Sequence, residues 1–133
     1  MASEEAGFSL LELLLVMALI GILLSFALPA WQQHQWVAGR QQAWLQLQRI
    51  GLQQEMRHLQ HGAYFNDMAL VTLAAQTSAY DYQIQLFDTT YVLTATAKSN
   101  GAQAYDVACQ RLTLSADGAV NSYGSGGESR DCK

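Results

Sequence analysis

The stretch Gly7-Phe8-Ser9-Leu10-Leu11-Glu12 opens the segment from which the architecture of this chain follows. The apolar run continues to Trp31, and Glu12 is the only charged residue within it. Residues 8–31 number 24, and as a helix they would extend roughly 36 Å, longer than the ~30 Å hydrocarbon core of a bilayer. We therefore predict a membrane-spanning helix over residues 8–31.

Glu12 is the unusual residue of this segment. A carboxylate near the centre of a bilayer costs on the order of 2.5–3.5 kcal/mol or more, and ionisable residues in membrane helices are normally functional. No Lys or Arg precedes Arg40. A secretory signal peptide fits less well, because it would need basic residues before an apolar core of only about 7–15 residues. A plain signal anchor is the other alternative.

The motif that ends at Glu12, followed by the apolar run, resembles the class III signal of the type IV pilin family. The resemblance implies that a prepilin peptidase removes residues 1–7 by cutting after Gly7, and that Phe8 is then N-methylated. It also implies that Glu12 guides assembly with other pilin subunits. Because the chain has no Lys or Arg before Arg40, we predict that Glu12 pairs with the amine that cleavage creates at Phe8, either of the same chain or, more usefully, of the preceding subunit. The leader departs from the pattern, because it is acidic where pilin leaders usually carry Lys or Arg.

Gly21 and Pro29 are the expected weak points of this helix. Pro inside a helix costs ~3 kcal/mol, and Gly is roughly 1 kcal/mol less favourable than Ala. In the pilins that the sequence resembles, the corresponding segment can bend or unwind when a subunit moves from bilayer to filament. A static kink in a membrane helix is the alternative.

Residues 32–133 are expected to form a periplasmic or extracellular head domain that includes the second half of the helix. Apolar residues at spacings of three, four and seven continue the helix to about Leu59. We expect this apolar stripe to face a sheet; it comprises Ala38, Leu45, Leu52, Met56 and Leu59, widened by Trp44 and Ile50.

Alternating apolar and polar residues predict the sheet itself. The expected strands are residues 80–86, 91–97, 111–115 and 119–123, preceded by a short helix at 68–75. Asp117-Gly118 is a hairpin signal, and the glycine-rich tail from residue 124 is expected to be flexible. The fold class is therefore α+β: a long N-terminal helix packed on a four-stranded antiparallel sheet.

Cys109 and Cys132 are the two cysteines of the chain. If the head lies outside the cytoplasm, they meet an oxidising compartment and should pair, which would stabilise the fold by roughly 3.5 kcal/mol. Tyr91-Val92-Leu93-Thr94-Ala95, Cys109-Gln110-Arg111-Leu112-Thr113-Leu114 and the late Cys132 resemble the PilE-type minor pilins. Lys133 departs from that group, which ends in an aromatic residue.

Charged residues make up 14% of the chain and the formal net charge is −4, which does not indicate a polyanion-binding surface overall. DNA capture must still be weighed, because some minor pilins take up DNA. Its candidate residues are Lys98, Arg111, Arg130 and Lys133, and nearby acidic residues leave that region almost neutral. We therefore favour an ordinary mixed surface over a DNA-binding one.

Other chemistry has little support in the sequence. His34, His58 and His61 form no ligand set with a cysteine, and solvated loop charges explain Asp117, Glu128 and Asp131 better than a calcium site. No catalytic motif is present, so we expect neither an enzyme nor a cofactor or metal.

These observations lead to one expected function with two alternatives. The expected protein is a minor pilin that crosses the inner membrane once and enters a type IV pilus through the inner-membrane assembly machinery. The alternatives are a pseudopilin of a type II secretion system and a DNA-capturing minor pilin. The cysteine pair favours pili, whereas a calcium-binding loop would favour pseudopilins.

Overall fold

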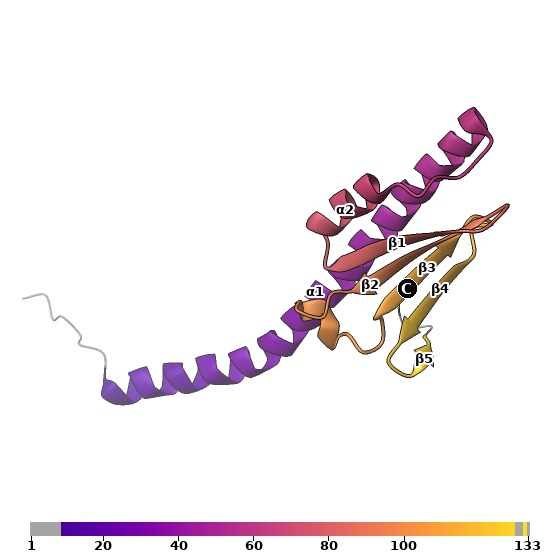
Figure 1. The fold of residues 1–133 in the computed structure, drawn as a ribbon. Coiled ribbons are helices and arrows are strands. Elements are labelled where there is room, and N and C mark those ends of the chain that lie inside the picture. The colour runs from indigo at the N-terminus through magenta and orange to yellow at the C-terminus, as the bar shows by residue number, and fades with distance from the viewer. Residues whose placement is uncertain (1–8, 130–131, 133) are drawn as a thin grey trace, which may run out of the picture. The chain divides into compact units, whose positions relative to one another are not determined.

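The computed structural model describes residues 9–129 and Cys132 (Figure 1). The chain divides into two compact units, residues 1–34 and 35–133. Helix α1 (Leu10–His61) begins in the first unit and ends in the second. The expected cleavage site at Gly7 and Phe8 lies outside the described residues, so processing stays a prediction.

The described part of the first unit is helical from Leu10 and exposes every side chain to solvent. Its apolar sequence is long enough to cross a membrane. Helix α1 continues without a break through Gly21 and Pro29, and a Cβ added at Gly21 would meet no atom within 4 Å. Flexibility at these two positions therefore also stays a prediction.

The second unit contains one antiparallel sheet with strand order β1-β2-β3-β4-β5 (Figure 1). Its strands are β1 (Tyr80–Leu86), β2 (Tyr91–Ala97), β3 (Arg111–Ser115), β4 (Val120–Gly124) and β5 (Gly127–Glu128). The predicted α+β class and the first four strands are confirmed, whereas the expectation of four strands is wrong.

The fifth strand forms in the tail that was expected to be flexible. Gly127 has φ 117°, a conformation that favours glycine, and Glu128 then pairs with Tyr123. The Ser129 N–H also donates to the Ser122 carbonyl at 2.8 Å. Backbone hydrogen bonds build this strand, so no side-chain alternation marks it in the sequence.

The core lies between the sheet and the second half of α1. Every second strand residue faces inward, and the buried set includes Tyr80, Tyr82, Ile84, Tyr91, Leu93, Ala95 and Leu112. From α1, Ala43, Leu47 and Ile50 pack against this layer. Gly51 lets the sheet come close, because a Cβ there would lie only 3.3 Å from the Tyr91 hydroxyl oxygen.

Most of the predicted apolar stripe of α1 faces away from this core, although Ile50 and Trp44 pack in or against it. Leu45 is 66% exposed, Leu52 63% and Leu59 84%, and Ala38 and Met56 are exposed as well. The buried positions are instead Gly39, Ala43, Leu47, Ile50, Gly51 and Gln54. Ile50 is buried as expected, but the rest of the stripe was assigned wrongly, because Gly39, Ala43, Gly51 and Gln54 fill most of the buried face and carry little apolar signal in the sequence.

Two short elements are fastened to α1 by polar contacts. Helix α2 (Met68–Gln76), close to its predicted bounds, begins at Asp67, whose carboxylate accepts from the Leu70 N–H at 3.1 Å and pairs with Arg57 at 2.6 Å. The buried Gln54 amide hydrogen-bonds both the N–H and the carbonyl of Phe65 in the preceding loop.

The short helix η1 (Ala102–Tyr105) lies in the expected loop between β2 and β3 and is fastened to α1 through Asp106. Arg40 forms a two-pronged ion pair with the Asp106 carboxylate, at 2.7 and 2.6 Å, and Asp106 is only 2% exposed. The Gln103 amide donates to the same carboxylate at 2.7 Å. These contacts join positions that are 66 residues apart.

The predicted disulfide is present between Cys109 and Cys132, whose Cα atoms lie 5.4 Å apart. Both cysteines are buried, and the Tyr80 hydroxyl donates to the Cys109 carbonyl at 2.9 Å. The bridge therefore attaches the end of the chain to the start of β3 and to the core.

Candidate functional site

The outer face of α1 in the second unit is an apolar surface that the head domain leaves uncovered. We call Leu45, Leu52, Met56 and Leu59 the outer stripe; all four are exposed. At about 100° per residue, these positions point opposite to the buried ones. Large apolar residues gathered on one exposed helix face indicate a surface that another protein covers.

Glu12 is the one acidic residue in the described part of the first unit, and its side chain is exposed among apolar neighbours. Among the described residues no cation pairs with it. A carboxylate in an apolar environment must be neutralised or must find a positive partner. Any such partner lies outside the contacts of the described residues.

Of the four basic residues weighed for DNA binding, the structure describes Lys98 and Arg111. Lys98 is held by the structure: its ammonium donates to the carbonyls of Ala75 and Ser78, at 2.6 and 2.8 Å, near the end of α2. Arg111 is exposed on β3. Arg130 and Lys133 lie outside the described residues.

Arg111 lies over an aromatic ring on the outer face of the sheet. Its guanidinium carbon is 5.0 Å from the centre of the Tyr123 ring, a cation–π arrangement. Next to this pair is a hollow of about 240 Å³, lined by Thr96, Gln110, Arg111, Tyr123 and Gly124. Sequence reasoning named Arg111 and missed Tyr123, because the register that pairs them spans β3 and β4.

Arg49 is a second exposed arginine, and sequence reasoning did not select it as a site residue. It lines a hollow of about 220 Å³ between α1 and α2, together with Gln46, Leu70, Leu73, Ala74 and Thr77. Arg49 follows Leu45 by four positions, so the hollow adjoins the outer stripe.

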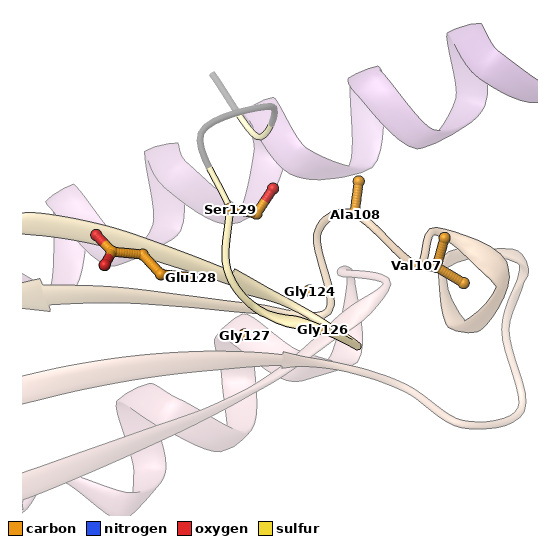
Figure 2. Close-up of a pocket in the computed structure, with 7 residues that line it drawn as sticks. All are labelled: Val107, Ala108, Gly124, Gly126, Gly127, Glu128 and Ser129. Carbon is orange, nitrogen blue, oxygen red and sulfur yellow. The ribbon is translucent and has the colours of Figure 1, made fainter.

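A third hollow, of about 350 Å³, lies beside the β4–β5 hairpin (Figure 2). Figure 2 shows Val107 and Ala108 on one side and the glycine-rich hairpin on the other. Gly124 is required here, since a Cβ would lie 2.4 Å from the Val107 carbonyl oxygen. Glu128 and Ser129 supply the only polar side chains of the lining, too few for a defined chemistry.

The histidines and loop acids are engaged locally or exposed. His58 stacks on Tyr64 with ring centres 4.4 Å apart, and His61 meets the edge of Phe65, while His34 is exposed. Asp117 accepts from the Ala119 N–H at 3.0 Å in the β3–β4 turn. Within residues 9–129 and Cys132, no three His, Cys, Asp or Glu side chains gather as metal ligands. Asp131 lies outside the described residues.

Comparisons with known families agree with this arrangement. Residues 3–28 match the model of the prokaryotic N-terminal methylation motif, the prepilin signal. The fold, the exposed apolar helix and this motif together define a type IV pilin. Residues 29–113 match the model described as type IV minor pilin ComP, DNA uptake sequence receptor. That match covers more than half of the chain, and the chain belongs to this type IV minor pilin family. No curated protein matches the chain.

Membership of a pilin family indicates what kind of protein the chain is. Pilin families are structural, and their members assemble with other pilin subunits in the pilus. The motif and the apolar helix fit a membrane-anchored pilin. The family match ends at residue 113, so β4, β5 and Cys132 lie beyond it.

Proposed function

We propose that this protein is a minor subunit of a type IV pilus. Before assembly the subunit is anchored in the inner membrane, and it enters the fibre through α1. The observation that carries the proposal is that α1 exposes a large apolar surface to solvent. The first unit exposes an apolar helix with one carboxylate, and the second exposes the outer stripe. Two uncovered apolar surfaces on one chain allow a head-to-tail contact, which generates helical filaments.

The path into the fibre begins with the prepilin peptidase. We propose that the peptidase cuts between Gly7 and Phe8 and that Phe8 is methylated. The new amine of a neighbouring subunit then meets Glu12 within the apolar bundle, where opposite charges attract more strongly than in water. Inner-membrane assembly machinery would supply the subunits one at a time. A bend between Gly21 and Pro29 would help each subunit to leave the bilayer.

The test is to follow the chain into fibres. Fibres sheared from cells that express the chain should contain it, and intact-mass analysis should show loss of residues 1–7 and gain of one methyl group. A chain that keeps its leader in cells with an active peptidase, or that never leaves the membrane fraction, would contradict the proposal. The pseudopilin alternative would be favoured if the chain stays in the membrane fraction, no fibres form, and cells that lack the chain are impaired in protein secretion.

DNA capture is the second candidate function, and two observations favour it. The matching family is described as a DNA uptake sequence receptor, and Arg111 offers an exposed guanidinium on the outer face of the sheet. Against it stand the near-neutral charge of the region and the structural role of Lys98. A salt titration of duplex binding tests it, because phosphate contacts weaken linearly with the logarithm of salt concentration.

A further inference from the structure

The basic residues of the described chain can be sorted by what holds them. Arg40 and Arg57 each form an ion pair with an aspartate. Lys98 donates to two backbone carbonyls. Among the described residues this leaves Arg49 and Arg111 as the arginines with no carboxylate partner, and both are exposed.

The two arginines have different surroundings. Arg49 lines the hollow between α1 and α2 and adjoins the outer stripe, which the fibre would cover. Arg111 projects from the outer face of the sheet, since its neighbour Leu112 points into the core. A ligand that binds the assembled subunit can therefore reach Arg111 more easily than Arg49.

The guanidinium of Arg111 rests on the ring of its cross-strand neighbour Tyr123. Cross-strand pairing places Thr96 of β2 on one side and Tyr123 of β4 on the other. The ring of Tyr123 lies beneath the guanidinium at 5.0 Å, which limits its rotamers and leaves its N–H groups free to meet a planar pair of acceptors. Thr96 and Gln110 add a hydroxyl and an amide to the same hollow.

We propose that the hollow around Arg111 and Tyr123 is where this chain contacts duplex DNA, with Arg111 donating two hydrogen bonds to one pair of acceptors. The proposal rests on DNA capture as the function and names the place where the DNA binds. A backbone phosphate and the O6/N7 edge of guanine both present such a pair.

Two acidic residues flank this site and reduce its affinity for DNA. Asp81 of β1 and Glu128 of β5 belong to the same cross-strand row as Arg111. At about 4.8 Å between neighbouring strands, each lies roughly 10 Å from Arg111. That separation exceeds the ~8 Å Debye length at physiological salt, so the acids weaken the attraction of DNA without cancelling it.

The experiment measures binding of the full chain, in a nonionic detergent, to a labelled mixed-sequence DNA duplex by anisotropy across a salt titration. Arg111→Ala should weaken binding at least about fivefold and lower the salt slope by about one. Glu128→Gln should strengthen binding about twofold at low salt, and Arg49→Ala, the matched control, should change little. Circular dichroism checks that each variant is folded.

Two further arms distinguish the source of the acceptors. If Arg111 reads a guanine edge, replacing guanine by 7-deazaguanine in the duplex should weaken the wild type and leave Arg111→Ala unchanged. If Arg111 binds phosphate, this replacement has no effect and Arg111→Lys keeps most of the affinity. Either result supports the site.

Different negative results would overturn the proposed binding site alone or DNA capture as a whole. If the wild type binds duplex and Arg111→Ala binds equally well, or Arg49→Ala is the weaker variant, the site is wrong while DNA capture stands. If the wild type shows no salt-dependent binding to the duplex, both the site and DNA capture are overturned.

Discussion

Gly39 lies where α1 packs directly against the Gln103 side chain of the η1 loop. A Cβ at this position would lie 2.3 Å from the side-chain amide oxygen of Gln103 and 3.1 Å from its side-chain amide carbon, Cδ. Gln103 is buried and hydrogen-bonds both the Asp106 carboxylate and the Trp36 carbonyl. Glycine in the helix therefore allows the polar contacts that fasten the loop.

We predict that Gly39→Ala destabilises the head domain by roughly 1–3 kcal/mol, even though alanine is the better helix former. The added methyl must displace a buried amide, which overpacks the site and breaks its hydrogen bonds. Gly21→Ala is the control, because it adds the same methyl to the same helix at a position where no atom lies within 4 Å. Denaturant unfolding of the full chain in detergent measures both, and equal stabilities for the two variants would refute this explanation.

Residue roles that depend on distant partners could not be predicted from the sequence. Lys98 looked like a surface cation, and only the fold brings the carbonyls of Ala75 and Ser78 within its reach. Arg40 and Asp106 pair across 66 residues, and no periodic signal connects them. By contrast, the cysteine pair was predictable, because the chain has two cysteines and the family resemblance implies an exported head.

The strands show how far an element can be read from a pattern. In β1 and β2 inward residues alternate with outward ones, so both strands were predicted at their observed bounds. Strand β5 consists of Gly127 and Glu128 and is held by backbone pairing, which leaves no such signal. Helix α1 was predicted as an element but largely assigned the wrong face, since most of the large apolar residues of its second half are exposed.

At the scale of this helix we predict that Leu52→Glu excludes the chain from fibres without unfolding the head. The glutamate would be solvated in the isolated subunit, where Leu52 is 63% exposed, and would be buried in the assembled one. Gln83→Glu introduces the same charge on the outer face of the sheet and should assemble normally. Immunodetection in sheared fibres decides, and normal assembly of Leu52→Glu would show that the outer stripe stays uncovered.

The whole head domain should lose stability in alkaline solution. Burial raises the pKa of Tyr80 and of Tyr91 above the ordinary value of 10.0, and the charges of Asp106 and Glu55 respectively raise them further. Because the unfolded chain releases these protons first, stability is full below about pH 10 and falls as the pH rises. Each tyrosine contributes a slope of up to about 1.4 kcal/mol per pH unit.

Denaturant unfolding between about pH 8 and pH 11 measures this loss. Tyr91→Phe removes one titrating group and should make the decline shallower. The variant also loses the 3.3 Å hydrogen bond that the Tyr91 hydroxyl donates to the Gly51 carbonyl. An unfolding free energy that does not change with pH over this range would mean that the two hydroxyls are not buried as described.

We propose that this pilin enters its fibre when Glu12 pairs with the N-terminal amine of a neighbouring subunit. The most direct measurement is the amount of Glu12→Gln, relative to wild type, in sheared fibres, with intact-mass analysis of the membrane fraction in parallel. We predict that the variant inserts and loses residues 1–7 but is absent from fibres, because the neighbour's amine is left buried and unpaired. Assembly of Glu12→Gln at the wild-type level would contradict the claim and make Glu12 a tolerated polar residue of the membrane helix.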